Sequence, residues 1–246
     1  MKDNIYCYNN NWKKKYVHPD LLTKDWELIP YEFENRGVGT DIYCIPVFNK
    51  IFCDELVSIA DTAPEGETIQ EVNGEPIIIS GWGNARHVNY PTYDIELKSL
   101  GLNSVYETFM NEFIYPLMYF VYKEYKKPPS LISESFLVKY TENNKNLGCH
   151  IDSSLASINI SINDSFLGGG TYFPKQKLLQ QPKLGYGLLH PGGISHKHGA
   201  KSTLKGERYQ LVSFCNTDDA TEEAAYERIM TKALKNAREE AGKKDI

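Results

Sequence analysis

Two histidines, an aspartate and an arginine in the second half of the chain have the types and spacing to do chemistry. His150 and Asp152 are separated by one residue, and His198 and Arg208 follow further along. Side chains two positions apart on a β-strand point to the same face, so the first pair could offer an imidazole and a carboxylate to one metal ion. Two histidines and one carboxylate are the ligand set of non-haem Fe(II) oxygenases.

Arg208 adds a second feature to this pattern. A guanidinium group is permanently charged and planar, so it can hold a carboxylate through two parallel hydrogen bonds. A metal triad together with a carboxylate clamp indicates an iron enzyme that consumes a dicarboxylic cosubstrate, 2-oxoglutarate. Spacing alone does not select the third ligand, because His190 or His196 could take the place of His198.

The elements that must position these residues are predicted from residue 131 onward, where the hydrophobic pattern has a period of two. Four short segments are predicted to be strands: residues 136–140, 156–162, 185–190 and 208–215. Short strands separated by glycine and proline turns are typical of a sandwich or jelly roll. We therefore predict a β-rich core in this half of the chain.

Two helices are predicted to support this core. Asn49 could cap a helix over Lys50 to Asp61, in which apolar residues fall at helical spacing. A second helix is predicted from about Ser104 to Tyr125, with a kink at Pro116. Helices first and strands afterwards indicate an α+β arrangement, in which the helices buttress one sheet.

Two other segments are predicted to lack regular structure. Residues 1–45 are polar and aromatic, and we expect only a short strand near 41–46. Residues 62–98 have the turn signals of a long connection, and connections of this length inside a compact domain are usually functional. Trp82 and Tyr90 in this connection are candidates for a lid over the substrate, or they could simply pack the loop onto the body.

The end of the chain has a different composition. Acidic residues come first and basic residues later, which complements a helix dipole, and a narrow apolar stripe runs through the segment. We expect a helical extension over 218–246. The remainder is expected to be one domain over 1–217, with N-terminal support from 1–130 and a jelly-roll core from 131–217.

Composition and charge argue against several classes of protein. Hydrophobic residues make up 41% of the chain, charged residues 24%, and the net charge is −5, as in ordinary soluble globular domains. No basic run is longer than Lys13-Lys14-Lys15, so no nucleic-acid partner is expected. The longest apolar run, Phe113 to Tyr122, is about half of what a membrane span needs. The five scattered cysteines indicate neither a zinc site nor a disulfide framework.

Short motifs occur in a fixed order over about residues 10–216, well beyond the predicted site. They are Trp12-Lys13-Lys14-Lys15-Tyr16, Ile45-Pro46-Val47-Phe48, Cys53-Asp54-Glu55-Leu56-Val57, Pro91-Thr92-Tyr93-Asp94-Ile95, Gly168-Gly169-Gly170, His190-Pro191-Gly192, His196-Lys197-His198-Gly199, Gly206-Glu207-Arg208-Tyr209 and Leu211-Val212-Ser213-Phe214. In this order, and with the His150–Asp152 pair, they resemble the C-terminal hydroxylase domain of the procollagen-lysine 5-dioxygenases, the lysyl hydroxylases.

The resemblance implies a double-stranded β-helix (jelly-roll) core and a role for each site residue. It implies three iron ligands, a clamp for the remote carboxylate of 2-oxoglutarate and two further cosubstrate contacts, which are His150, Asp152 and His198, then Arg208, then Tyr140 and Asn159. A phenol and an amide can both hydrogen-bond to carboxylates, so the chemistry of the last two residues agrees with these roles.

The activity implied by the resemblance is hydroxylation of peptidyl lysine, in collagen-like X-Lys-Gly sequences, with release of succinate and CO2. The implied cofactors are Fe(2+), 2-oxoglutarate as cosubstrate and L-ascorbate. Two alternatives stay open. One is a prolyl or small-molecule hydroxylase of the same fold, and the other is a catalytically silent binding module.

The resemblance also implies a collagen-like peptide or protein as partner and suggests a homodimer. The large glycosyltransferase-like regions of that family have no counterpart here, so no sugar transfer is expected. The first residues lack the apolar core of a signal peptide. We therefore expect a cytoplasmic location for the chain as given, and the endoplasmic reticulum lumen if it is an excised domain of a secretory-pathway enzyme.

Overall fold

The computed structural model describes most of the chain, namely residues 4–72, 75–84, 86–87, 89–123 and 129–217. The chain divides into a compact unit, Met1–Asn216, and a second unit, Thr217–Ile246. The C-terminal helix predicted over 218–246 lies outside the described residues. No helix in the described ranges is long and apolar enough to cross a membrane.

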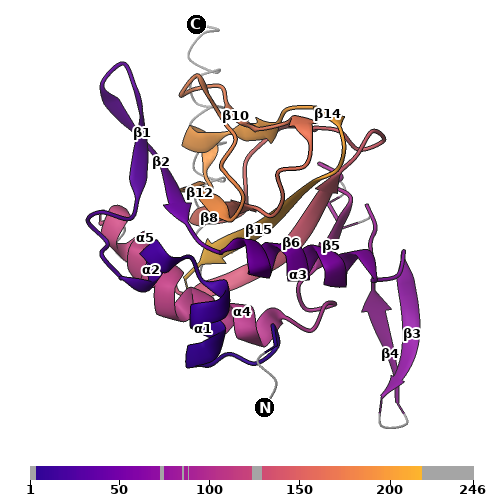
Figure 1. Ribbon diagram of the computed structural model, residues 1–246. Coiled ribbons are helices and arrows are strands. Elements are labelled where there is room, and N and C mark those ends of the chain that lie inside the picture. Colours follow the sequence, from indigo (N-terminus) through magenta and orange to yellow (C-terminus); the bar gives the residue numbers. More distant parts are fainter. Residues whose placement is uncertain (1–3, 73–74, 85, 88, 124–128, 218–246) are drawn as a thin grey trace, which may run out of the picture. The chain divides into compact units, whose positions relative to one another are not determined.

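A seven-stranded antiparallel sheet is the centre of the first unit (Figure 1). In spatial order its strands are β1 (Tyr31–Asn35), β2 (Val38–Pro46), β12 (Tyr186–Pro191), β8 (Ala156–Ser161), β15 (Arg208–Asn216), β6 (Leu131–Tyr140) and β5 (Asp94–Glu96). The four strands predicted from the period-two pattern correspond to β6, β8, β12 and β15, so this part of the prediction is confirmed.

The residues of β8 show that the two faces of this sheet differ. Every residue of the strand is buried. Ile158 and Ile160 belong to the main hydrophobic core, whereas the intervening Ser157 and Asn159 point to the opposite face because strand side chains alternate. Buried polar groups are costly unless they are hydrogen-bonded, so this second face must meet polar partners from another layer or from a ligand.

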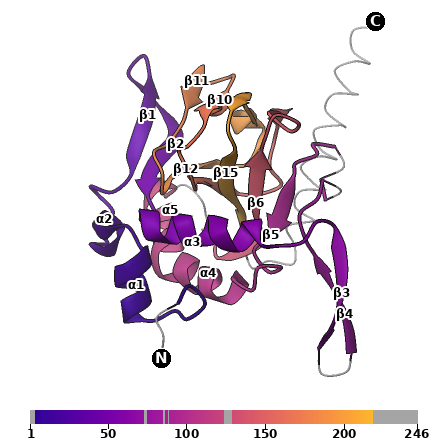
Figure 2. The same cartoon turned by 45° about the vertical axis from the view of Figure 1, so that its right-hand side comes forward.

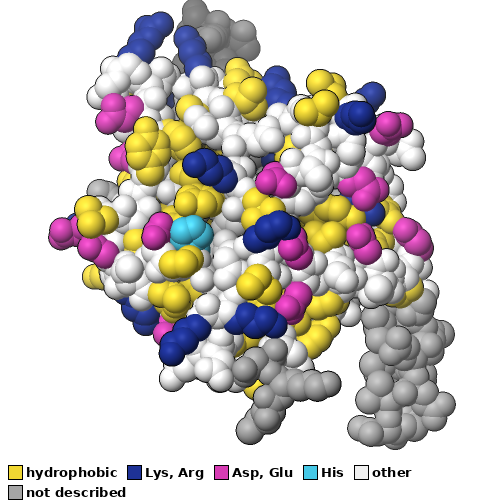
Figure 3. Space-filling view, viewed as in Figure 1, with side chains coloured by type: hydrophobic (Ala, Val, Ile, Leu, Met, Phe, Trp, Pro, Cys, Tyr) yellow, Lys and Arg dark blue, Asp and Glu magenta, His cyan; other side chains and the backbone are white. Residues whose placement is uncertain are grey.

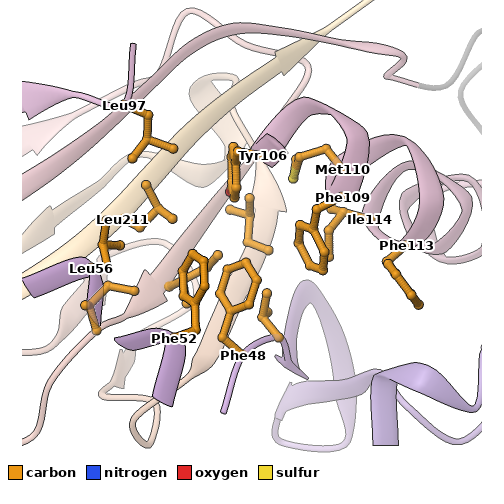
Figure 4. Close-up of a cluster of buried hydrophobic side chains, with 14 of the residues drawn as sticks. Phe48, Phe52, Leu56, Leu97, Tyr106, Phe109, Met110, Phe113, Ile114 and Leu211 are labelled. Atoms are coloured by element: carbon orange, nitrogen blue, oxygen red, sulfur yellow. The ribbon is translucent and has the colours of Figure 1, made fainter. Parts of the chain in front are cut away.

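Helices cover the apolar face of the large sheet (Figure 2). They are α1 (Asn10–Tyr16), α2 (Pro19–Leu22), α3 (Lys50–Asp61), α4 (Asn103–Phe109) and α5 (Tyr115–Val121). The core beneath them is rich in aromatic rings (Figure 4), and the rings of Phe48 and Phe52 stack with centroids 3.7 Å apart. Burial of each such side chain stabilises the fold by about 1.5–3 kcal/mol.

Helix α3 has the predicted limits and the predicted cap. The Asn49 side chain accepts hydrogen bonds from the backbone N–H groups of Ile51 and Phe52, at 3.0 and 3.3 Å. The same side chain donates to the Lys15 carbonyl at 2.6 Å. The cap therefore starts α3 and also ties it to α1.

The second predicted helix is present as far as Val121, but it is interrupted. A π-helical turn, Met110–Ile114, separates α4 from α5. The wider turn ends two residues before Pro116, which has no N–H to donate to the carbonyl one turn earlier. In this turn each hydrogen bond spans one residue more than in an α-helix.

The two segments predicted to be largely irregular contain more regular structure than expected. The short strand predicted near 41–46 is present as part of β2, but residues 1–45 also hold α1, α2 and β1, so the rest of that prediction is wrong. The prediction for residues 62–98 is wrong as well. Residues 62–98 hold a separate hairpin, β3 (Glu67–Val72) and β4 (Glu75–Ser80), as well as β5. These elements are short, and α1 and β5 depend on partners distant in sequence, α3 and β6, which a local pattern does not reveal.

A second antiparallel sheet faces the polar side of the large one. It contains β11 (Leu178–Gln180), β10 (Thr171–Phe173), β13 (His198–Ala200) and β7 (Leu147–His150), while β9 (Leu167–Gly168) pairs with β14 (Thr203–Lys205). Phe173 packs against Ile42 and Leu188 of the large sheet. Leu147 packs against the side chains of β6. The polar face of the large sheet is therefore enclosed between two layers of strands.

Candidate metal and cosubstrate site

Strands β7 and β13 place the two predicted histidine ligands beside each other. His150 and His198 are paired in the antiparallel register, and their ring centroids are 4.7 Å apart. Asp152 follows the end of β7, and its backbone N–H donates to the Gly192 carbonyl at 3.1 Å. Our expectation that His150 and Asp152 lie on one strand is wrong, because the chain leaves β7 after His150 to pair with the loop at Gly192.

The three side chains nevertheless converge. The ligand atoms of His150, Asp152 and His198 all lie within 4.8 Å of one another. Asp152 Oδ1 is 3.3 Å from Nε2 of His150 and 3.8 Å from Nε2 of His198. Two ligands at about 2.1 Å from a metal and at right angles are about 3 Å apart, so the spacing fits one face of an octahedral site after a small contraction.

Backbone carbonyls determine which nitrogen of each ring faces the aspartate. Nδ1 of His150 is 2.9 Å from the Gly148 carbonyl oxygen, and Nδ1 of His198 is 3.1 Å from that of His196. A carbonyl can only accept, so each Nδ1 carries the proton and each Nε2 offers its lone pair toward Asp152. Histidines that bind metals are commonly oriented in this way.

Asp152 is buried and is held by a serine. The Ser157 hydroxyl donates to Asp152 Oδ2 at 2.6 Å, which leaves Oδ1 toward the histidines. Burial alone would raise the pKa of Asp152, but the nearby His198, the hydrogen bond with His150 and the Ser157 hydroxyl lower it well below its usual range. The carboxylate is therefore ionised and can coordinate a cation.

The two histidines differ in their affinity for protons. Burial lowers the pKa of His198, and the approach of Asp152 offsets this only in part. Burial also opposes protonation of His150, but its bonds with Asp152 and the Gly148 carbonyl raise the pKa above the ordinary value. Protons therefore compete with a metal mainly at His150.

The alternative third ligands, His190 and His196, lie outside the metal cluster. Nε2 of His196 bonds to the Thr40 carbonyl at 2.8 Å. His190 is fully buried with its ring centroid 4.5 Å from that of His198, and burial lowers the pKa of His190 to about 3. Its Nε2 faces the Asn159 amide nitrogen at 3.4 Å, so this neutral ring orients Asn159.

Arg208 has an unusual environment for a cation. Its side chain is 1% exposed, and Nε and both Nη atoms are buried without a hydrogen-bond partner among the described residues. The guanidinium lies 5.2 Å from the centroid of the Tyr140 ring. Burying a charge without a counter-charge costs several kcal/mol, so this donor set fits a buried anionic ligand such as a carboxylate.

Gly169 makes room for this arginine. Its φ is +80°, and a Cβ placed on it would lie 3.0 Å from Arg208 Cδ and 3.1 Å from the Phe166 ring. A side chain at this position would therefore be strained by the backbone and would press on Arg208. The Gly168-Gly169-Gly170 motif thus has a physical function beside the site.

A cavity of about 260 Å³ opens between the two sheets beside the metal cluster. All three predicted ligands line it, and so do Tyr140 and Asn159. Asn159 Oδ1 is buried without a partner among the described residues. Arg208 is not among the lining residues, but its guanidinium lies against the ring of Tyr140, which lines the cavity.

Three polar residues of this region were not predicted. Gln210 lies two positions after Arg208 on β15, lines the cavity, and has a buried Nε2 without a partner among the described residues. Ser157, which bonds to Asp152, lies two positions before Asn159 on β8. Period-two spacing from a predicted site residue could have found both. Thr171 comes from the other sheet, and only the tertiary structure brings it to the cavity.

The two lid candidates have different environments. Trp82 is buried, donates from Nε1 to the Ala60 carbonyl at 2.7 Å, and stacks on Tyr93. Trp82 therefore packs its loop onto the body, and the lid hypothesis is wrong for this residue. Tyr90 is 43% exposed, lines the cavity, and has its ring centroid 5.2 Å from that of His150.

The chain is similar in sequence to procollagen-lysine dioxygenases. It is 30% identical over 210 residues to the procollagen lysyl hydroxylase and glycosyltransferase of Acanthamoeba polyphaga mimivirus. It is 32% identical over 210 residues to procollagen-lysine,2-oxoglutarate 5-dioxygenase 2 of Mus musculus. Both matches cover 83% of this chain, but 22% and 27% of the relatives. The chain thus spans about a quarter of the length of the curated relatives that it matches.

Two solved structures are also similar. One is a 2OG-Fe(II) oxygenase family oxidoreductase from Burkholderia pseudomallei, with a TM-score of 0.49 and 14% identity over 71% of this chain and 84% of that one. The other is the viral collagen prolyl hydroxylase of Paramecium Bursaria Chlorella virus-1, with a TM-score of 0.43 and 12% identity over 72% of this chain and 97% of that one. No model of a known protein family matches the chain.

Proposed function

We propose that this chain, which is related to the procollagen-lysine 5-dioxygenases, hydroxylates peptidyl lysine in collagen-like sequences with Fe(II) and 2-oxoglutarate. One observation carries the proposal. A two-histidine, one-aspartate cluster at the second sheet and a fully buried arginine on the large sheet, without a hydrogen-bond partner among the described residues, border the same space between the two sheets. A purely structural arginine at such a position would be paired, because an isolated buried charge is costly.

We infer that the two facing sheets form a double-stranded β-helix. Seven antiparallel strands pack against four, and the polar side chains point into the space between them. The metal cluster sits where β7 ends and β13 begins, at the border of this space. Such a placement keeps the ligands rigid while one side stays open to substrate.

The metal would be held by Nε2 of His150, Oδ1 of Asp152 and Nε2 of His198. Three ligands on one face leave the opposite positions open for cosubstrate and dioxygen. When bound, iron and 2-oxoglutarate supply the oxidising chemistry, in which one oxygen atom of O₂ enters a substrate C–H bond and the other enters succinate, with loss of CO2. The residues of the chain position these reactants and exclude water. Ascorbate would keep the iron reduced.

The cosubstrate would be recognised by donors that have no partner among the described residues. Arg208 offers a two-pronged cationic fork, and the amide of Gln210 is a second donor of this kind. Tyr140, which lines the same cavity as Gln210, adds a hydroxyl. A dicarboxylate can bind the metal at one end and the arginine at the other. The donor set therefore fits 2-oxoglutarate better than a ligand with a single charge.

The rest of the cavity suits an alkyl chain that ends in a cation. Its wall contains apolar side chains from both sheets: Phe136, Val138, Leu147, Val212 and Phe214. Among the described wall residues Asp152 is the sole carboxylate, and it serves the metal. The ring of Tyr90 beside His150 can instead attract a lysine ammonium through its π face.

The test is succinate formation by the purified protein with Fe(II), 2-oxoglutarate and ascorbate, with and without an X-Lys-Gly peptide. We expect the peptide to stimulate turnover, one oxygen atom to appear on its lysine by mass spectrometry, and Asp152→Ala to abolish both. A matched peptide with proline in place of lysine is the control. Equal stimulation by that control would overturn lysine as the substrate, and no turnover by iron-loaded protein would overturn the enzymatic proposal.

A further inference from the structure

A second cavity, separate from the metal site, opens beside β1 and β11, which are the last strands of the two sheets. We name it the aromatic groove. It has a volume of about 600 Å³ and is lined by three aromatic side chains, Tyr31, Phe33 and Tyr186, together with Pro46 and Pro182. Among the described residues, none lines both this groove and the cavity at the metal cluster.

A hydrophobic cluster lies between the two cavities. Ile42, Phe173 and Leu188 are fully buried, and Phe33 of the aromatic groove packs against them. Phe173 also contacts His198, with ring centroids 5.3 Å apart. The groove is therefore distinct from the site described above, but packed side chains that include Phe33 and Phe173 connect the two.

The aromatic groove presents apolar rings to solvent. Tyr31 is 65% exposed, and its ring meets that of Phe33 edge-on with centroids 5.4 Å apart. The space-filling view shows hydrophobic side chains gathered over β1 and β2, with charged groups among them (Figure 3). Two aromatic rings held edge-on leave a ring face exposed, on which a flat apolar ring of a ligand can pack.

The lining of the groove carries more negative than positive charge. Its charged residues are Asp20, Asp25 and Lys183. Lys24, which lies between the two aspartates in sequence, is paired with Glu112 at 3.1 Å. The single lysine of the lining offsets the two carboxylates only in part. The charge distribution favours a ligand that combines apolar rings with positive charge.

We propose that the aromatic groove binds a proline-rich, basic stretch of the polypeptide substrate in the polyproline II conformation. Such a segment has no internal hydrogen bonds and presents proline rings at a regular spacing, and aromatic-lined grooves recognise it. The amides of Gln180 and Gln181 and the Tyr31 hydroxyl are available to its carbonyls, and Asp25 to its basic side chains. This inference rests on the proposed function, since it assigns the same collagen-like chain a second binding site.

A second binding site makes the reaction depend on substrate length. A peptide long enough to occupy both places gains from the second contact at high effective concentration, whereas a short peptide reaches only the metal site. Removal of the groove contact should therefore raise KM for long substrates and leave KM for short ones unchanged. The value of kcat should change for neither.

The direct test uses a fluorescent peptide of Pro-Pro-Arg repeats, which contains no lysine and so cannot be a substrate. We expect binding to the metal-free protein by anisotropy and at least about fivefold weaker binding by Tyr31→Ala, as for a central aromatic contact. Tyr119→Ala is the matched control, because Tyr119 is similarly exposed, at 60%, on α5 outside the groove. Asp25→Asn should weaken binding, and Lys183→Glu, at the lysine of the lining, should strengthen it.

Three results would overturn the inference: equal binding by wild type and Tyr31→Ala, equal binding of a proline-free arginine peptide, or no binding at all. The proposed function is separately testable. If hydroxylation of short X-Lys-Gly peptides persists while the Pro-Pro-Arg peptide does not bind, the groove proposal alone fails. If the peptide binds and no peptide is hydroxylated, the proposed activity fails and the groove stands as a binding site.

Discussion

On the helix-covered face of the large sheet, β8 and β15 present Ile158, Ile160 and Leu211 to a dense apolar core. On the opposite face, one position away along the same strands, they present Asn159 and Gln210. Both faces are buried to a similar degree. They differ in whether their buried polar groups have hydrogen-bond partners.

Two buried serines on the helix-covered face, Ser135 and Ser213, are paired. Ser213 Oγ lies 2.9 Å from the Tyr106 hydroxyl and accepts from Ser135 Oγ at 2.8 Å. On the cavity face, atoms of Asn159, Gln210 and Arg208 have no partner among the described residues. Burial with pairing stabilises a fold, and burial without it is tolerated where a ligand supplies the partner. The comparison therefore separates the face built for stability from the face built for binding.

The largest effect is expected from Arg208→Met. Loss of the buried fork should reduce 2-oxoglutarate affinity by about 10²- to 10³-fold, the usual cost of removing one partner of a buried charge pair. The ligand-free protein should not be destabilised, because an unpaired buried charge is replaced by an apolar chain of similar length. Cosubstrate titration and urea unfolding, without ligand, measure the two effects.

Arg208→Lys is the control for this substitution. This variant keeps the charge but loses the two-pronged geometry. Its affinity for 2-oxoglutarate should therefore lie between those of the wild type and Arg208→Met. A marked loss of stability in ligand-free Arg208→Met would contradict the contrast between the two faces.

Leu211→Ala should have the opposite profile. Leu211 is fully buried on the helix-covered face, next to Gln210 in sequence. Its truncation should lower the free energy of unfolding by about 2–5 kcal/mol, through lost burial and the remaining cavity. The 2-oxoglutarate affinity of the folded fraction should stay unchanged, as isothermal titration below the unfolding transition can show. A selective loss of affinity would mean that the two faces are coupled.

Ser157→Ala should have an intermediate effect on metal binding. The Ser157 hydroxyl holds Asp152 Oδ2 at 2.6 Å, and removal of such a supporting bond typically costs about 10- to 100-fold in metal affinity. Ser161→Ala is the matched control, because Ser161 is a buried serine on the same face of β8 that bonds instead to the Asn163 carbonyl. Competition with a coloured chelator measures both affinities, and equal losses would argue against the specific role of Ser157.

The smallest effect concerns Glu112 in the helix layer, a carboxylate whose partners are all present. Burial would raise the pKa of Glu112, but hydrogen bonds from Tyr8, Lys13 and Lys24 lower it to about 2. A lowered folded-state pKa adds stability that is present above the ordinary carboxyl pKa and is lost as the pH falls toward 2.

Glu112→Gln should therefore destabilise the protein by about 1 kcal/mol at neutral pH, the upper range for partly exposed pairs, and the difference from wild type should vanish between about pH 4.5 and 2. Thermal unfolding across this range is the measurement, with Glu107→Gln on α4 as the control. A difference that persists at low pH would assign the effect to packing instead of charge.

The sequence by itself determined the features that depend on local pattern. The alternation of residues identified β6, β8, β12 and β15, and Asn49 identified the start of α3. The residues of the candidate site could also be predicted, because their side-chain chemistry and the order of their motifs are properties of the linear chain. Gln210 and Ser157 could have been added from the same period of two.

Only the tertiary structure decided which of these residues meet. Strands β7, β10 and β13 are only three or four residues long, too short for a local pattern to reveal, and they exist because they pair with one another in a sheet. That pairing brings His198, and neither His190 nor His196, to Asp152. It also encloses the polar face of the large sheet and leaves the aromatic groove open at its far edge. Local sequence does not distinguish these three histidines and does not reveal either cavity. Both are decided by the packing of segments that are distant in sequence.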